Sequence, residues 1–358
     1  MKPKSTLKEI ARRAGVSVMT ASNVVNGKQG HFSSDTYNRV MQVAAEVGYS
    51  PNIAAKHLRK GALGLIGIVL PDIMNPYFSE LSQWAIREAE ANDYTVVLSF
   101  THSDPALVEQ FINGTQQMPV DGIILSAFPV EIREHNTPVP IVLLGEQQAP
   151  SPFDNIILDN AALARAATEH LIELGRTRIA PVGMVAGELS GMAQPRFEGY
   201  LAAMQSAGLP VDPDWLVTVN TPTFHRDQGA YVMQKLLALD NPPDAVFCFN
   251  DPVAFGALKV LVDSGYRVPE DVAVIGVDDI VESRYFIPSL STIAVDRKRV
   301  ATLAVNLLVD RIAGKREGEP AYFEVPFKLV PRASTLGRQF DSSAAWPSAD
   351  QQWRIDDQ

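Results

Sequence analysis

Eleven short apolar runs recur between residues 64 and 330, separated by stretches in which apolar residues follow helical spacing. Strands that are apolar on both faces are typical of parallel, doubly wound sheets buried between helices. The runs lie at 64–71, 94–100, 122–128, 140–146, 155–160, 179–187, 216–220, 245–251, 272–279, 291–296 and 323–330. The alternation predicts an α/β core over 63–337, a length that suits two lobes with one crossing near 155–160.

The segment before this core, TLKEIARRAGVSVMTASNVVNG, contains two short helical patterns on either side of Gly15. Thr6 and Ser17 are placed to cap these helices, and glycine allows the sharp reversal between them. The second pattern carries short polar side chains instead of strong helix formers, which lets a helix backbone descend into the DNA major groove. The segment therefore predicts a helix-turn-helix head.

Charge is distributed unevenly along the 358 residues, although the net charge is −10. Residues 1–61 carry ten Lys or Arg and three Asp or Glu side chains, whereas the rest carries 21 basic and 38 acidic ones. A small basic head on a large acidic body indicates that the head binds a polyanion. A solvated basic tail is the alternative that charge alone leaves open.

Several motifs together make the chain resemble the LacI family of bacterial repressors from about residue 6 to about residue 337. These are TLKEIARRAGVS, VSVMTASNVVNG, the step VGYSPN, and AAKHLRKG followed at once by GLIGIVLP. The resemblance implies a helix-turn-helix domain at 1–50 and a hinge helix and linker at 51–62. It also implies a periplasmic-binding-protein-like core at 63–337, with further crossings near 290 and 322. We therefore expect an N-lobe of about 63–160 and 292–322, a C-lobe of about 161–290 and 323–337, and a flexible tail at 338–358.

The resemblance also assigns DNA contacts residue by residue. It implies that the second helix reads bases and that a leucine of the hinge wedges into the minor groove and kinks the operator. The implied DNA-binding residues are Thr6 and Ser17 at the helix starts, Val18, Met19 and Asn23 for bases, Thr20, Ser22 and Asn26 for phosphates, and Leu58 as the wedge with Ala55 and Arg59 beside it.

Polar and aromatic side chains collect where the predicted strands end, which is where open α/β sheets bind ligands. By this rule the candidate ligand-binding residues are Asp72, Asn75, Tyr77, Phe78, Ser126, Glu146, Asn250, Asp251 and Asp278. Rings for stacking and carboxylates for hydroxyl groups suit a polar effector. For any one of these residues, a helix cap or a satisfied polar group at a strand end is the alternative.

The resemblance adds Arg196, Phe224 and Ser190 to this set. Glu146 and Ser190 stand where purine-responsive members of the family have an aromatic and a basic residue. This difference favours a hydroxyl-rich sugar or sugar derivative, and an arginine fork leaves a sugar acid or sugar phosphate open.

Motifs for catalysis are absent from the sequence: there is no Gly-rich dinucleotide loop after a strand, GKS/T loop, HExxH, GxSxG or pair of Cys or His ligands. We therefore expect neither enzyme activity, a cofactor nor a metal site. The single cysteine, Cys248, and the lack of a long apolar run predict a cytoplasmic protein without a membrane span.

The sequence favours a homodimeric repressor that binds a pseudo-palindromic, double-stranded operator and responds to a small effector. A sugar-binding protein or α/β enzyme with an incidental N-terminal extension is the competing interpretation.

Overall fold

The structure is a computed structural model that describes residues 6–25, 32–49, 62–102, 104–113, 118–126, 137–145, 151–186, 191–220 and 224–337. The chain divides into two compact units, residues 1–64 and 65–358, each of which is described by itself. The predicted hinge helix and tail lie outside the described residues. None of the helices in the described ranges has the length and apolar character needed to cross a bilayer.

The described residues of the first unit form the helices α1 (Leu7–Ala14), α2 (Val18–Val25) and α3 (Ser34–Glu46). The N–H of Glu9 donates to the Thr6 hydroxyl, and Gly15 ends α1 with φ of 65°. The described residues of this unit that form its core are Ile10, Ala11, Ala14, Ala21, Val24, Val40, Val43 and Ala44. Small residues at the α1–α2 crossing let two short helices approach across a tight turn, so the predicted helix-turn-helix is confirmed.

A six-stranded parallel sheet forms the centre of the N-lobe, in the order β12-β5-β4-β3-β1-β2. Its strands are β1 (Leu65–Leu70), β2 (Thr95–Phe100), β3 (Gly122–Ser126), β4 (Ile141–Leu144), β5 (Asp154–Ile157) and β12 (Tyr322–Glu324), and its helices are α5 (Pro76–Ala91), α6 (Pro105–Ile112) and α11 (Arg297–Ile312).

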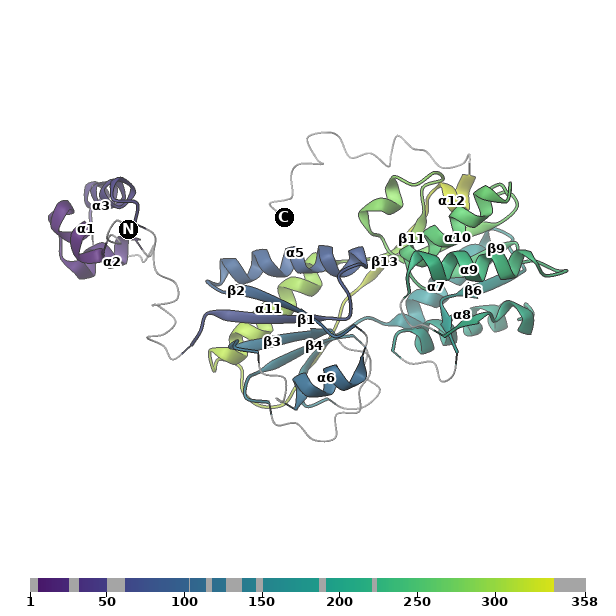
Figure 1. Cartoon of the computed structure of the whole chain (residues 1–358), viewed down its shortest axis with the longest axis horizontal. Helices are drawn as coiled ribbons and strands as arrows, with labels where there is room; N and C mark the ends of the chain where they lie inside the picture. Colours follow the sequence, from purple (N-terminus) through teal and green to yellow (C-terminus); the bar gives the residue numbers. More distant parts are fainter. Residues whose placement is uncertain are drawn as a thin grey trace. The chain divides into compact units, whose positions relative to one another are not determined.

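Side chains on successive positions of these strands pack into two different helix layers. Ile68 packs on the side of α5 and α11, whereas its neighbour Val69 packs on the side of α6. Figure 1 shows α5 and α11 on one face of the sheet and α6 on the other. Both faces are therefore buried, as the continuous apolar runs predict.

The C-lobe is built on a second sheet with the order β13-β11-β10-β9-β6. Its strands are β6 (Ile179–Val182), β9 (Ala245–Cys248), β10 (Ala273–Asp278), β11 (Ser291–Val295) and β13 (Phe327–Val330), with a separate pair β7 (Met184–Val185) and β8 (Thr218–Val219). Its helical segments are α7 (Asn160–Glu173), α8 (Ala193–Ser206), η1 (Pro213–Trp215), α9 (Arg226–Leu237), α10 (Asp251–Asp263), η2 (Val281–Arg284) and α12 (Ala333–Leu336).

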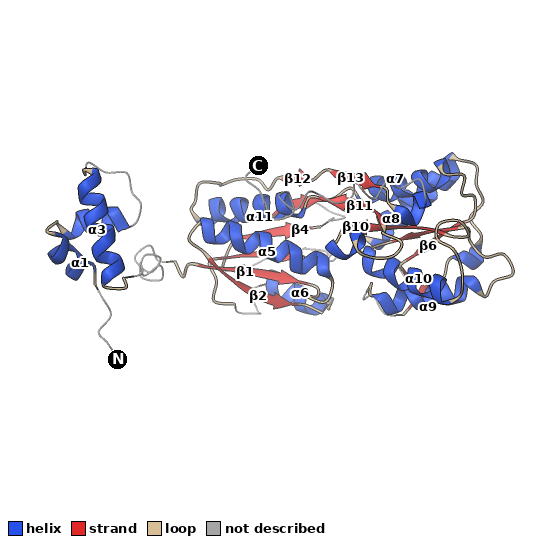
Figure 2. Cartoon of the chain, turned by 90° about the horizontal axis from the view of Figure 1, so that it is seen from above, coloured by secondary structure: helices blue, strands red, loops and turns tan. Residues whose placement is uncertain are grey.

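Two helix pairs cover this second sheet, with α7 and α8 on one side and α9 and α10 on the other (Figure 2). The α9–α10 pair approaches closely because Gly229 and Gly256 lie at its crossing. A Cβ atom built on either glycine would lie 1.9 Å from a backbone oxygen of the facing helix. Among the described strands, β13 departs from the predicted parallel arrangement, because it runs antiparallel to β11.

The predicted crossings between the lobes near 290 and 322 are displaced by a few residues. β11 belongs to the C-lobe, since Ser291 pairs in register with Ile275 of β10, so the return to the N-lobe comes after Val295. The run 323–330, predicted as one strand, forms β12 in the first sheet and β13 in the second. Pro326 separates the two strands, because it has no N–H for a ladder hydrogen bond.

Candidate functional site

The second helix of the head presents the predicted base-reading side chains to solvent. Val18 is 45% exposed and Met19 is 74% exposed, and Asn23 is partly exposed. The face of α2 that packs into the head instead carries Ala21 and Val24. Large apolar side chains on the open face of a short helix stabilise nothing inside the head, so this face is available to a partner.

The polar residues around this face also hold the helix start. The N–H of Thr20 donates to the Ser17 hydroxyl over 3.0 Å, and the two hydroxyls lie 2.8 Å apart. Ser22 is partly exposed on the same helix. The predicted contacts Asn26, Ala55, Leu58 and Arg59, and the predicted effector residues Glu146 and Ser190, lie outside the described residues.

In the N-lobe, the loop after β1 and the start of α5 hold four candidate effector residues. Asn75 caps α5 by accepting the N–H of Tyr77, and Asp72 accepts the N–H of Met74. The rings of Tyr77 and Phe78 meet edge to face, with centroids 5.2 Å apart. A fifth candidate, Ser126, ends β3 and is partly exposed.

In the C-lobe, Arg196 lies on α8 and is 5% exposed. Its Nε donates to Oδ1 of Asn160 over 2.8 Å, and its Nη1 donates to the carbonyl of Phe249. One bond joins α8 to the first residue of α7, and the other joins it to the residue that follows β9. Arg196 therefore supports the fold at this edge, in addition to the effector contact that the resemblance implies.

Phe224 is held in a backbone conformation that non-glycine residues rarely adopt, with φ of 49°. Its N–H donates to Oε1 of Gln228 and its carbonyl accepts from Nδ2 of Asn250, both over 3.0 Å. Asn250 also caps α10 through the N–H of Val253. Both polar ends of the Asn250 side chain are thus used to position the aromatic residue and the helix.

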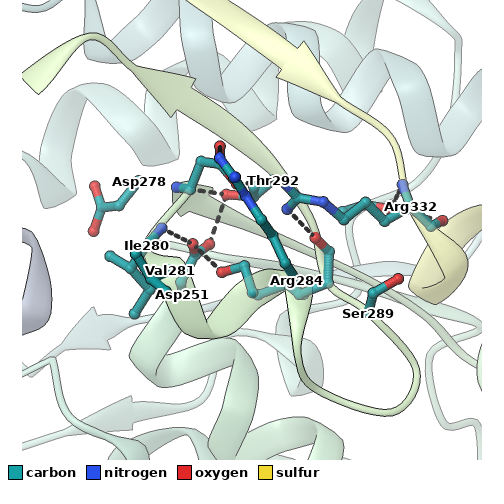
Figure 3. Close-up of polar contacts among 12 residues, drawn as sticks. Asp251, Asp278, Ile280, Val281, Arg284, Ser289, Thr292 and Arg332 are labelled. Atoms are coloured by element: carbon teal, nitrogen blue, oxygen red, sulfur yellow. Dashed lines mark hydrogen bonds and ion pairs between the residues drawn. The ribbon is translucent and has the colours of Figure 1, made fainter. Parts of the chain in front are cut away.

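Asp251 and Asp278, predicted together as effector ligands, differ in their surroundings (Figure 3). Asp251 is fully buried and its two oxygens accept from the hydroxyls of Thr292 and Ser283 and from the N–H of Ile280. These partners all belong to the C-lobe, so the carboxyl group of Asp251 holds the scaffold together at this edge, and its predicted contact with an effector stays a prediction.

The Asp278 side chain points away from that network in Figure 3, and its carboxyl group accepts no hydrogen bond from the described part of the chain. The residue is only 6% exposed. Burial raises the pKa of Asp278 to about 6, although the nearby charges of Arg196 and Arg297 act to lower it. Burial, followed by the charge of Asp278, raises the pKa of Tyr77 to about 12. The structure thus brings Tyr77, Arg196 and Asp278 together.

Sequence reasoning missed polar residues that join the two lobes near this group. Nε2 of His225 lies 3.0 Å from Oδ2 of Asp72, and Glu80 pairs with Arg297 over 3.0 Å. No single-position signal distinguished them, because a histidine at a helix start and a glutamate within a helix are ordinary surface residues. Within the described ranges, no group of three or more acidic, His or Cys side chains is arranged to hold a metal ion.

Comparisons with known proteins agree with this architecture. The family description "Bacterial regulatory proteins, lacI family" matches residues 6–52, and "Periplasmic binding protein-like domain" matches residues 168–335. A repressor named PurR from Haemophilus influenzae (strain PittEE) is 32% identical over 340 residues, which cover 92% of this chain and 98% of the relative.

Two of the solved structures that resemble this chain match more than nine-tenths of its length. The lac repressor dimer bound to operator and the anti-inducer ONPF has a TM-score of 0.70 and 26% identity, over 93% of this chain and 99% of its own. The complex of the regulator CelR with cellobiose has a TM-score of 0.66 and 27% identity, over 92% and 100%. The chain belongs to the LacI family and is a DNA-binding transcriptional repressor.

Proposed function

We propose that a small, neutral, hydroxyl-rich effector, of the sugar class, binds around Asp278 and controls the affinity of the repressor for its operator. The observation that carries this proposal is the carboxyl group of Asp278, which accepts no hydrogen bond from the described residues although the residue is only 6% exposed. A buried acceptor of this kind is costly unless a donor reaches it, and sugar hydroxyls are such donors. The rings of Tyr77 and Phe224 supply apolar faces on which a sugar ring stacks.

The charges around this group favour a neutral effector over a sugar acid or sugar phosphate. Arg196 already donates from Nε and Nη1 to Asn160 and Phe249, so only part of its guanidinium is left for an anion. Arg297 likewise donates to backbone carbonyls. The carboxyl groups of Asp278 and Glu80 would repel an anion. One solved relative is a complex with cellobiose, and another has bound ribose.

The operator contacts are inferred from the exposed face of α2, and the assembly from the symmetry of the operator. We propose that α2 reads bases through Val18, Met19 and Asn23, with Thr6, Ser17, Thr20 and Ser22 near phosphates. Two copies of the chain would bind the two halves of a pseudo-palindromic operator, since one short helix offers few base contacts. The related lac repressor structure is a dimer on its operator. A repressor of this kind acts in the bacterial cytoplasm, where its DNA lies.

A thermal-shift panel tests the effector proposal, because a ligand that binds only the folded state raises its stability. The panel holds cellobiose, ribose, gluconate, glucose 6-phosphate and hypoxanthine, the last because Tyr77 and Phe224 would also stack on a nucleobase. We expect a neutral sugar to raise the melting temperature of the wild type by several degrees at about 100 times its Kd, and to leave Asp278→Asn unshifted.

Asp263→Asn, an exposed change on α10, is the matched control and keeps the full shift. Stabilisation by gluconate, glucose 6-phosphate or hypoxanthine alone, or an equal shift in Asp278→Asn, would contradict the proposal. Gel shifts with operator DNA then show whether the stabilising compound releases or tightens the repressor.

A further inference from the structure

We propose that Glu80 and Arg297 act as a positioning pair between the lobes: they hold the backbone at Asp278–Asp279 and so tie the effector-binding carboxyl group to the arrangement of the lobes. The inference rests on the proposed role of Asp278 and adds a regulatory role for two residues of the opposite lobe. They are far apart in the sequence and become neighbours because α5 and α11 pack side by side on the first sheet.

The backbone at the end of β10 needs external support. Asp278 has φ of 117° and Asp279 has φ of 51°, and both are non-glycine residues. Such conformations cost on the order of 1–3 kcal/mol each and persist only where the surroundings hold them. Two such conformations follow one another at the residue that would bind the effector. We call this segment, Asp278–Asp279, the corner, and it is the most strained segment of the proposed site.

The C-lobe itself holds only part of this corner. The N–H of Asp279 donates to the Thr292 hydroxyl over 3.3 Å, and Oδ1 of Asp279 accepts from Arg332 over 2.5 Å. Arg284 adds a longer ion pair of 3.6 Å to Oδ2. The first two contacts fix the amide and the side chain of Asp279, whereas the Arg284 side chain is 46% exposed and its long pair adds little. None of the three contacts reaches the carbonyl groups of Asp278 and Asp279.

The N-lobe supplies the bonds to those carbonyl groups. Arg297, the first residue of α11, donates from Nη1 to the carbonyl of Asp278 and from Nη2 to that of Asp279, the latter over 2.9 Å. Its Nη2 also lies 3.0 Å from Oε2 of Glu80 on α5. Oε1 of Glu80 accepts the N–H of Val281 over 3.1 Å. The pair therefore bonds with the carbonyl groups of Asp278 and Asp279 and with the N–H of Val281.

Partial burial strengthens the pair, because solvent screens it less. The side chains of Arg297 and Glu80 are 13% and 19% exposed, so the pair is screened less than a surface ion pair. If the lobes shift by the length of a hydrogen bond, the guanidinium loses both carbonyl groups and the corner loses its support. An effector on Asp278 stabilises the lobe arrangement in which these bonds exist, and this is the coupling that an effector-controlled repressor requires.

Hydrogen exchange of the ligand-free, full-length protein tests the pair without reference to the effector. We expect Arg297→Met to raise amide exchange of residues 278–284 at least about tenfold, because the local opening loses its opposing bonds. Glu80→Gln, which keeps an oxygen for the N–H of Val281, should raise it less. Arg297→Lys should be intermediate, since one ammonium group cannot bond both carbonyl groups in the arginine geometry.

Arg284→Met is the matched control, since it removes an arginine that contacts the same Asp279 from within the C-lobe. It should leave this exchange nearly unchanged, and β6 should exchange equally slowly in every variant. Unchanged exchange of residues 278–284 in Arg297→Met would overturn the inference. A uniform rise that includes β6 would do the same, because it indicates general destabilisation.

A cellobiose titration by thermal shift then separates this inference from the proposed function. If the wild type binds cellobiose, we expect Arg297→Met to bind it at least about tenfold more weakly and Arg284→Met to bind it with unchanged affinity. Equal binding in both variants would overturn the coupling. If cellobiose shifts neither the wild type nor any variant, the choice of cellobiose as effector fails, whereas hydrogen exchange still decides whether the pair holds the corner.

Discussion

The reading face of α2 and the strand ends around Asp278 present polar and apolar side chains in opposite ways. On α2, Met19 is 74% exposed, and the polar residues near it cap their own helix. Around Asp278, the polar residues are buried and their partners come from other elements, as with Arg196 and the carbonyl of Phe249. The exposed side chains of α2 are not needed for the fold of the head. The polar side chains around Asp278, in contrast, are part of the packing of the core.

This difference predicts a division between affinity and stability. Substitutions on the open face of α2 should weaken DNA binding and leave folding intact, because they remove no internal contact. Substitutions among the buried strand-end residues should lower stability first, because they leave donors without acceptors. Asp278 is the exception in the second region, since its carboxyl group accepts no hydrogen bond from the described residues.

The largest effect is expected for Asp251→Ala. The change removes the acceptor of the Ser283 and Thr292 hydroxyls and of the N–H of Ile280, all within the C-lobe. We expect a loss of roughly 3 kcal/mol or more in the free energy of unfolding, measured by urea denaturation. Asp263→Ala, exposed on the same helix, should change it by less than about 0.5 kcal/mol. A small effect of Asp251→Ala would show that the buried network is not what holds this edge.

A smaller, pH-dependent effect is expected at Asp154, the first residue of β5. Burial would raise the pKa of this carboxyl group, but hydrogen bonds from Arg311 and Arg316 outweigh it and lower the pKa to about 2. A lowered pKa stabilises the folded state above the unfolded pKa near 4, and this contribution is lost as the pH falls toward 2.

The Asp154→Asn variant should therefore lose about 2 kcal/mol at pH 7 and show a flatter stability profile between pH 4 and pH 2. The measurement is urea unfolding at several pH values, with the exposed change Asp240→Asn as control. A profile parallel to that of the wild type would mean that the two arginines do not depend on this charge.

The smallest effect in free energy is expected for Asn23→Ala, and it should appear only in DNA binding. Using an operator selected from random duplex DNA, we expect about tenfold weaker specific binding, since one base contact contributes about 1–3 kcal/mol of discrimination. The melting temperature should not change. Gln42→Ala, an exposed change on α3, should alter neither quantity. Equal weakening of specific and non-specific binding would remove Asn23 from the base-reading set.

The head could be predicted from the sequence almost completely in its described part. Thr6, Gly15 and Ser17 act within a few residues of their own positions, so caps and turn follow from local chemistry. In the core, the strands were predicted close to where they lie, but their assignment to lobes near Val295 and Pro326 was displaced. Two short apolar runs in succession look alike whichever sheet they join.

The candidate site was predicted less well than the fold, because residues that look alike in the sequence have different tertiary partners. Asp251 and Asp278 both end strands and both carry carboxyl groups, yet only tertiary partners show that the first is committed to Thr292 and Ser283. Likewise, nothing near Arg297 in the sequence indicates that it reaches the backbone of Asp278.

The sequence by itself determined the order of elements, the exposed face of α2 and the family, because helix caps, periodicity and motif spacing act over short distances along the chain. Only the tertiary structure decided which strand-end side chains are satisfied and which lobe holds the corner at Asp278. Hydrogen bonds form between groups that folding brings within about 3 Å, whatever their separation in the sequence.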